Sequence, residues 1–156
     1  MIYLYTDGSA LGNPGPGGLG IVLVSGIHRK ELSQAFRFTT NNRMELLAVI
    51  LGLEALKQPN HKVTVVSDSK YVIDAVTKNW LRSWEAKAFN GKKNADLWQR
   101  FLRVSKNHQM HYEWIKGHNG HPENEKCDKL ATHAAHNGPF LIDQGYEQLK
   151  ARSNLF

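Results

Sequence analysis

The chain has only one cysteine, Cys127, among its 156 residues, so it cannot form an internal disulfide. It has no apolar run near the roughly 20 residues that a membrane-spanning helix needs, and no charged-then-apolar leader follows Met1. We therefore expect a cytoplasmic protein that contacts no membrane, since one free thiol is compatible with a reducing compartment. This length suits a single domain over residues 1–156 with one buried core.

Negative charge is also scarce, because 14 Asp and Glu stand against 20 Lys and Arg and leave a formal net charge of +6 at pH 7. A basic surface favours a polyanionic partner such as nucleic acid, although many solvated surfaces are basic without a specific partner. Net charge alone therefore does not show whether the protein binds nucleic acid, and we turn to the sequence motifs.

The N-terminal part of the chain predicts three antiparallel strands. In "MIYLYTDGS" (1–9) residues alternate with the period of a strand, and Asp7 lies near its C-terminal end. The segment "NPGPGG" (13–18) is a turn, because prolines lack a donor and glycines favour turn geometries. Ser25-Gly26 then separates "LGIVLVS" from "KELSQAFRF" as a hairpin turn does, which completes a meander.

Helices and strands alternate in the rest of the chain. Apolar residues recur at helical spacing from Asn42 to Lys57, and "KVTVVSDS" (62–69) is typical of a buried parallel strand. Further helices are predicted over 70–79, 95–107 and 126–136, the last opened by Pro122, and a fifth strand over 109–117. The pattern predicts an α/β fold with a five-stranded mixed sheet, three antiparallel strands and then two parallel ones, flanked by helices. We expect residues 138–156 to form an irregular C-terminal tail.

Asp7 and Asp68 each lie at the end of a strand, where open α/β sheets place their chemistry. A right-handed crossover would set the two strands side by side, so that the two carboxylates converge. Structural alternatives remain open for both, since Asp7 can form a turn with Gly8 and Asp68 can cap a helix. Glu45 likewise follows Asn42 at the spacing of a capping box.

Asp128 lies inside a predicted helix, next to its buried stripe, where an aspartate gains neither helix propensity nor a cap. The alternative is an exposed Asp128 paired with a neighbouring lysine. Two like charges about 4 Å apart repel by ~4 kcal/mol at an effective dielectric of about 20, so a cluster of acids requires cations. Carboxylate oxygens suit Mg²⁺ or Mn²⁺, and two such ions can hydrolyse a phosphodiester.

Several segments of the chain resemble type 1 ribonuclease H, the bacterial ribonuclease HI branch: "YTDGSALGNPGPGGLG", "TTNNRMEL", "VVSDSKYVIDAV", "WIKGHNGHPENEKCDKLA" and the Trp-bearing segment between the last two. The resemblance runs through nearly the whole chain in order. It implies a five-stranded mixed sheet flanked by helices, and endonucleolytic cleavage of the RNA strand of RNA–DNA hybrids that leaves 5′-phosphate and 3′-hydroxyl ends.

The same resemblance implies the active-site residues. By motif match, Asp7, Glu45, Asp68 and Asp128 fall on the four carboxylates that hold two Mg²⁺ ions, for which Mn²⁺ can substitute. His118 falls on the mobile catalytic histidine, and we expect a monomer with no obligatory protein partner. Because no hybrid-binding segment precedes Met1, we also expect low processivity.

The loop "KGHNGHPENE" (116–125) has other interpretations. His118 and His121 could be plain surface residues, or could join Cys127 in a zinc site, although these three lack a standard structural spacing. With the resemblance, His118 becomes a proton shuttle or an aid to product release, and His121 has no matching role. Glu125 lies close enough in sequence to help position the attacking water or a third ion.

Nucleic-acid contacts are predicted at two places. Donor groups precede a helix N-terminus, where phosphates are well held, although capping and turn chemistry could explain them equally. Trp80 and Trp84 share one helix face among basic residues, so they are either a platform for nucleic acid or part of the core. The predicted contact residues are Asn13, Thr40, Asn41, Asn42, Arg43, Trp80, Trp84, Lys87, Lys92 and Lys93.

The basic protrusion expected from the resemblance is short here, since residues 85–94 are only moderately basic and Glu85 follows the second tryptophan. Hybrid affinity is therefore reduced or carried elsewhere. An integrase or a DNA-resolving nuclease would also gather carboxylates, but "GHNGHPENEKCD" and the tryptophan segment do not suit it. A binding module that reads hybrids without cleaving them is the remaining alternative, although all four carboxylates and His118 are present.

Overall fold

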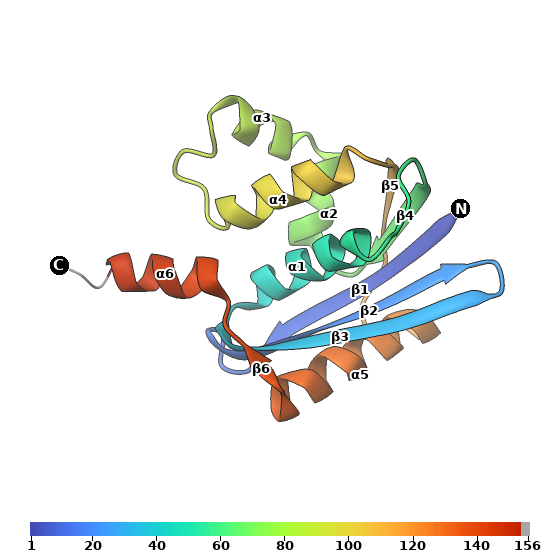
Figure 1. Ribbon diagram of the computed structural model, residues 1–156, viewed down its shortest axis with the longest axis horizontal. Helices are drawn as coiled ribbons and strands as arrows, with labels where there is room; N and C mark the ends of the chain where they lie inside the picture. Colours follow the sequence, from blue (N-terminus) through green and yellow to red (C-terminus); the bar gives the residue numbers. More distant parts are fainter. Residues whose placement is uncertain (154–156) are drawn as a thin grey trace.

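The computed structural model describes residues 1–153, and a six-stranded mixed sheet runs through its centre in the order β5-β4-β1-β2-β3-β6 (Figure 1). The elements along the chain are β1 (Ile2–Ala10), β2 (Gly15–Ser25), β3 (His28–Thr39), α1 (Asn41–Glu54), β4 (Lys62–Ser67), α2 (Lys70–Thr77), α3 (Trp80–Ala86), α4 (Ala95–Ser105), β5 (Gln109–Trp114), α5 (Pro122–Asn137), β6 (Phe140–Leu141) and α6 (Gln144–Ser153). No helix within residues 1–153 is both long and apolar enough to cross a membrane.

The predicted fold class is confirmed. Strands β1, β2 and β3 form an antiparallel meander, β4 pairs parallel to β1, and β5 pairs parallel to β4. The β2–β3 hairpin turns at Gly26, whose φ of 60° matches the left-handed geometry that tight hairpins require. The sixth strand, β6, pairs parallel to β3. It has only two residues, which is too short to show the period of a strand in the sequence.

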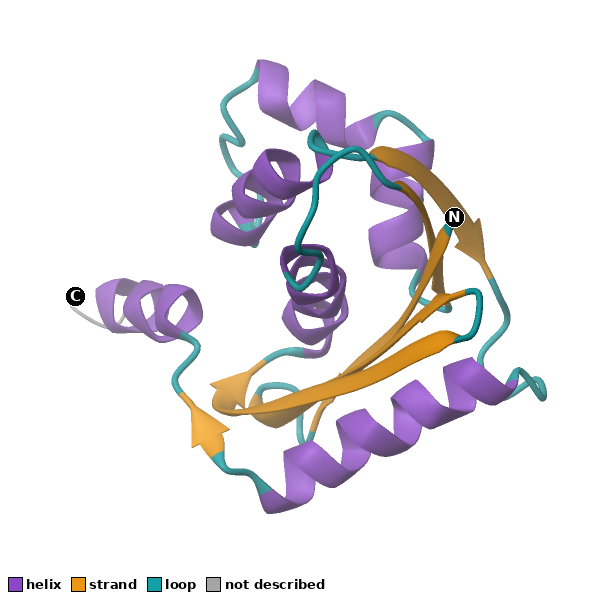
Figure 2. Cartoon of the chain, turned by 45° about the vertical axis from the view of Figure 1, so that its right-hand side comes forward, coloured by secondary structure: helices purple, strands orange, loops and turns teal. Residues whose placement is uncertain are grey.

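The helices cover both faces of the sheet, with α1 to α4 on one side and α5 on the other (Figures 1 and 2). Helix α1 packs against β1, β2 and α4, so most of its residues are buried and it forms the centre of the core. Trp98 of α4 is fully buried and contacts the rings of Trp84 and Phe101. The helical layer therefore buries the middle of α1, while Asn42 and Glu54 near its two ends stay exposed.

Two predicted boundaries need correction. Helix α1 begins at Asn41 and ends at Glu54, and Thr40 is its N-cap because its Oγ1 accepts a hydrogen bond from the Arg43 backbone N–H at 3.3 Å. The predicted cap, Asn42, is instead inside the first turn. Thr40 and Asn42 lie two residues apart in a polar run, and the sequence pattern does not distinguish them.

The prediction of an irregular tail over 138–156 is wrong for most of its length, since β6 and the ten-residue helix α6 lie within it. Distant partners order this segment: Asp143 pairs with Arg43, and Glu147 pairs with Arg37 of β3. Residues 154–156 of the predicted tail lie outside the described residues.

Candidate active site

Asp7 and Asp68 lie side by side because their strands are neighbours. The parallel pairing of β1 with β4 ends at Tyr5 and Val66, and each aspartate comes two residues beyond this pair. Strand β1 continues to Ala10 on its pairing with β2, so Asp7 lies inside the strand rather than at its end. The expectation that the two carboxylates converge is confirmed.

Glu45 comes to the same place from the first turns of α1. A Cβ atom at Gly8 would lie 2.4 Å from the carbonyl carbon of Met44 and 2.5 Å from the backbone nitrogen of Glu45, so only glycine permits this approach of β1 and α1. Asp7, Glu45 and Asp68 each offer a carboxylate oxygen, and these oxygens lie within 4.8 Å of one another. Within residues 1–153 they form the one such group of three or more acidic, histidine or cysteine ligands.

Asp128 approaches from α5, on the opposite face of the sheet. A Cβ atom at Gly20 of β2 would lie 2.2 Å from the Cys127 carbonyl oxygen, so a glycine is needed for α5 to pack this closely. Asp128 is half-buried and lines the same cleft as the other three carboxylates, a space of about 420 Å³. Asp128 is not one of the three residues in that group, but its carboxyl interacts with that of Asp7 and contributes to the raised pKa of Asp7.

The cleft holds its acids at an electrostatic cost. Burial raises the pKa of Asp7 to about 7, and the negative charge of Asp68 adds to the increase. Burial also raises the pKa of Glu45 well above its ordinary value, with a further contribution from Asp7. The cluster thus binds a positive charge readily, whether a proton or a cation.

The donor atoms fit a metal ion. Glu45 Oε1 is buried without a hydrogen-bond partner, and a buried polar atom of this kind is costly unless a ligand satisfies it. Three converging carboxylates are the hard oxygen donors that magnesium-type cations prefer. A divalent cation would neutralise their repulsion and occupy the unpaired Glu45 oxygen.

The loop after β5 closes the other side of the cleft. His118 is exposed, has a φ of 55°, and lines the cleft together with Gly117. Burial raises the pKa of Asp68, while His118 and the amide of Asn124 act in the opposite direction. The indole Nε1–H of Trp114 donates to the Asp68 backbone oxygen at 3.0 Å and holds the end of β4 in place.

Asn124 is the residue near the cleft that the sequence interpretation missed. It is 3% exposed, and its Oδ1 has no hydrogen-bond partner. Neither Asn124 nor its neighbour Glu125 is among the residues that line the cleft, but the Asn124 side chain interacts with the carboxylate of Asp68. Glu125 is exposed, and its role in positioning water or a third ion stays a prediction. Pro122 opens α5 as predicted, and counting from it places Asn124 in the first helical turn, which is the only signal the sequence offered.

Two alternative interpretations do not fit the structure. Asp68 is not a helix cap, because Ser69 caps α2 through a 3.3 Å hydrogen bond from the Val72 N–H to Ser69 Oγ. No zinc cluster of His118, His121 and Cys127 forms within residues 1–153.

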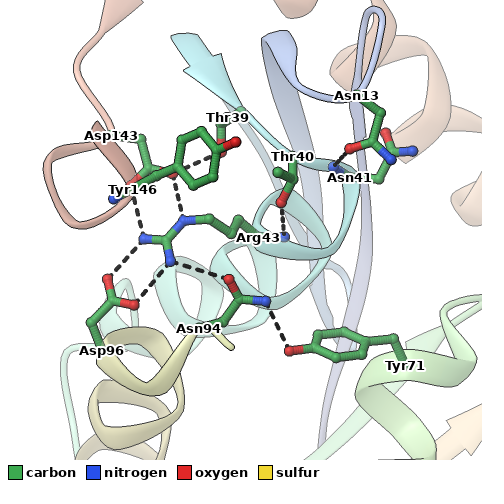
Figure 3. A network of polar contacts seen from close by, with 10 residues as sticks. All are labelled: Asn13, Thr39, Thr40, Asn41, Arg43, Tyr71, Asn94, Asp96, Asp143 and Tyr146. Carbon is green, nitrogen blue, oxygen red and sulfur yellow. Dashed lines mark hydrogen bonds and ion pairs between the residues drawn. The ribbon is translucent and has the colours of Figure 1, made fainter. Parts of the chain in front are cut away.

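Four predicted nucleic-acid contacts, Asn13 between β1 and β2 and Thr40, Asn41 and Asn42 at the start of α1, form one polar cluster, which we call the polar turn. Figure 3 shows the first three. Asn13 Oδ1 accepts from the Asn41 N–H at 2.9 Å, and Asn41 Oδ1 accepts from the Ala10 N–H at 2.6 Å. Asn42 is exposed and lines both the carboxylate cleft and a neighbouring cavity that Asn13 and Thr40 also line. The polar turn therefore stabilises the local chain path through its own hydrogen bonds, and it also borders the cleft.

Arg43 does not occupy the place expected of a phosphate ligand. Its side chain is 2% exposed, and its guanidinium group forms bidentate pairs with Asp143 at 2.8 and 2.9 Å and with Asp96 at 2.9 and 2.8 Å (Figure 3). The guanidinium has no free face for a phosphate. We correct the prediction accordingly: Arg43 joins α1, α4 and the start of α6.

The tryptophan segment divides between core and surface. Trp84 is half-buried and packs edge-on against Trp98 at 5.8 Å between ring centroids, while Lys92 Nζ lies 5.2 Å from its ring centroid. Trp80 is 45% exposed with Lys78 Nζ 5.4 Å from its ring centroid. The predicted contacts Lys87, Lys92 and Lys93 are all exposed.

Comparison with known proteins gives one consistent family. The family model described as RNase H matches residues 1–136. A protein named "Ribonuclease H" from Shewanella sp. (strain ANA-3) is 50% identical over 152 residues, which cover 94% of this chain and 95% of that protein.

Solved structures agree with the sequence comparison. The crystal structure of LC9-RNase H1, a type 1 RNase H with the type 2 active-site motif, superposes with a TM-score of 0.79 at 32% identity, over 96% of this chain and 80% of that one. The structure of LC11-RNase H1 in complex with RNA/DNA hybrid has a TM-score of 0.63 at 26% identity, over 87% of this chain and 97% of that one.

Proposed function

Because the chain belongs to the ribonuclease H family, we propose that it is an endoribonuclease that hydrolyses the RNA strand of RNA–DNA hybrids, leaving 5′-phosphate and 3′-hydroxyl ends. The observation that carries this proposal is the convergence of Asp7, Glu45 and Asp68, whose carboxylate oxygens lie within 4.8 Å of one another. The complex of LC11-RNase H1 with RNA/DNA hybrid supports the choice of substrate. We further propose that residues 1–156 act as one catalytic domain and as a monomer.

The metal site consists of Asp7, Glu45, Asp68 and Asp128, which would hold two Mg²⁺ ions, with Mn²⁺ as a substitute. The raised pKa of Asp7 and the unpaired oxygen of Glu45 support this assignment. When bound, such ions supply an activated water and stabilise the leaving 3′ oxygen.

The protein's own residues position the reacting groups. Glu45 is held by a helix that packs directly on β1, so its carboxylate needs little rearrangement to serve as a ligand. His118, at the exposed rim of the cleft, exchanges a proton at its ring nitrogen during hydrolysis or product release.

Two regions of the surface supply the substrate contacts. The polar turn of Asn13, Thr40, Asn41 and Asn42 donates hydrogen bonds to backbone phosphates or sugars near the minor groove. The second contact region consists of Trp80, the exposed edge of Trp84, Lys87, Lys92 and Lys93. Its exposed lysines supply phosphate contacts, and Trp80 supplies a face for the sugars.

The direct test uses a hybrid labelled on either the RNA or the DNA strand, incubated with Mg²⁺ and again with chelator. Duplex RNA and duplex DNA serve as substrate controls. We expect cleavage of the RNA in the hybrid alone, and none in chelator. Asp7→Asn should bind the hybrid without cleaving it.

The rival functions give different results in this assay. Cleavage of duplex DNA would favour an integrase-like or DNA-resolving nuclease. Binding of the hybrid without metal-dependent turnover would show a binding module with structural carboxylates. Full activity of Asp7→Asn would refute the assignment of the metal site.

A further inference from the structure

A cavity of about 480 Å³ lies beside the carboxylate cleft, between α6 and the N-terminal ends of α1 and α4. One wall comes from the polar turn and the start of α4, through Asn13, Pro14, Thr40, Asn42, Lys93 and Asn94. The opposite wall is α6, through Tyr146, Leu149, Lys150 and Ser153. These four residues recur at i, i+3, i+4 and i+7, so one face of the helix borders the cavity along its length.

The charge of this cavity is opposite to that of the cleft next to it. Its lining contains two lysines, Lys93 and Lys150, and no aspartate or glutamate. The cleft is lined by four carboxylates, and Asn42 borders both spaces. A polyanion whose reacting phosphate lies among the carboxylates would find a basic site in the adjoining cavity.

Helix α6 is held firmly enough to position a side chain. Asp143 caps the helix, since its Oδ1 accepts from the Tyr146 N–H at 3.3 Å, and its carboxylate is paired with Arg43 (Figure 3). Tyr146 is buried against Phe38, with 5.4 Å between ring centroids. Glu147 forms a bidentate pair with Arg37 at 2.9 and 2.8 Å.

Lys150 projects from this anchored helix. It lies one turn after Tyr146, with its Nζ 5.9 Å from the Tyr146 ring centroid, and it is exposed. The ring and the lysine stem lie on the same face of α6, which holds the ammonium group at the cavity while leaving it accessible.

We propose that α6 is part of the nucleic-acid interface and that Lys150 contacts a backbone phosphate of the hybrid whose scissile phosphate occupies the carboxylate cleft. This inference rests on the proposed function, because it assumes that the hybrid is the bound polyanion. The contact compensates in part for the short, moderately basic segment over residues 85–94. It also gives the C-terminal helix a role that an irregular tail could not have.

The test compares Lys150→Ala with Lys106→Ala. Lys106 is exposed at the C-terminal end of α4, away from the cavity at the N-terminal end of that helix, and its replacement removes the same charge. Hybrid binding is measured by fluorescence anisotropy in chelator over a range of salt concentrations. Cleavage kinetics are measured separately with Mg²⁺.

Lys150→Ala should lower hybrid affinity several-fold at low salt and reduce the slope of log affinity against log salt by about 0.9, as expected for one lost phosphate contact. It should raise KM for the hybrid while kcat and the melting temperature stay close to the wild-type values. Lys106→Ala should change none of these quantities.

Equal behaviour of the two variants would overturn the proposal, because net charge alone would then explain any loss. Wild-type-like binding by Lys150→Ala, alongside RNA cleavage by the wild-type protein, would refute the role of α6 and leave the proposed function intact. A wild-type protein that neither binds nor cleaves the hybrid would refute both.

Discussion

Gly8 and the backbone of Glu45 are so close that a Cβ atom at residue 8 would lie 2.5 Å from the Glu45 nitrogen. This contact brings the helix that carries Glu45 against the strand that carries Asp7. The metal site therefore depends on a residue that provides no ligand atom.

Replacing Gly8 with alanine should separate α1 from β1 or distort both. We expect a loss of about 1–3 kcal/mol of stability from overpacking, and a much larger fractional loss of activity. Thermal unfolding and hybrid cleavage measure the two effects.

Gly26→Ala is the matched control, because Gly26 has open space around it. The one source of strain in this variant is the left-handed φ of 60° at residue 26. It should cost about 1 kcal/mol and leave kcat unchanged. Activity retained by Gly8→Ala would show that the helix position is not critical.

Asp7→Asn should stabilise the metal-free protein and reduce its dependence on pH. The pKa of Asp7 rises from an ordinary 3.8 to about 7, through burial and the charge of Asp68. Between these pH values the folded protein keeps a proton that the unfolded chain releases, so its stability falls as pH rises from about 4 to about 7. The largest cost at higher pH is about 4 kcal/mol, since one pKa unit is about 1.4 kcal/mol. Melting temperatures in chelator across this range measure the effect, and a large destabilisation by Asp7→Asn would instead indicate a structural role.

Mg²⁺ should raise the melting temperature of the wild-type protein. A ligand at 100 times its dissociation constant stabilises the folded state by about 2.7 kcal/mol. The increase should be small in Asp7→Asn, because that variant lacks the central carboxylate of the cluster. An equal increase in both proteins would place the bound cation elsewhere.

His118→Ala should slow hydrolysis by about 10² or more, as the loss of a proton-transferring group does, with little change in hybrid affinity. His121→Ala is the control, since His121 lies on the same loop and is not among the residues lining the cleft. Cleavage kinetics measure the rate of hydrolysis, and fluorescence anisotropy measures the hybrid affinity. Similar rates for the two variants would remove His118 from the mechanism.

Arg43→Met should destabilise the protein by about 3–5 kcal/mol, because it leaves the buried carboxylate of Asp143 without its partner. Arg100→Ala breaks an ion pair with Glu54 in which both side chains are more than a third exposed, at 38% and 35%. That loss should be below about 1 kcal/mol. Urea unfolding of the two variants gives the comparison, and equal losses would contradict a structural role for the Arg43 network.

Local patterns in the sequence were sufficient for the strands of the meander and for most helices. The alternation of residues in β1 and the β-branched run in β4 are patterns of a few neighbouring residues, so they can be recognised without knowledge of the rest of the fold. The boundaries of α1 and the short strand β6 were harder to predict. Which residue caps a helix depends on the detailed path of the chain, and a strand of two residues is too short to show a period in the sequence. Helix α6 was missed because its order comes from Arg37 and Arg43, which are more than 90 residues away in the chain.

Residue types in a fixed order were enough to predict the α/β class and the family, because alternation, helical spacing and motifs can all be read along the chain. The crossover rule also predicted that Asp7 and Asp68 converge, but the close approach at Gly8 that brings Glu45 to the same site became visible only in the packing of α1 against β1. The tertiary structure also changed the role assigned to Arg43. This residue was predicted as a phosphate ligand, but it is buried and pairs with Asp96 and Asp143, which connects α1, α4 and the segment before α6. The physical reason is that the partner of a charged group depends on which distant segments pack around it, and residue spacing along the chain does not contain that information.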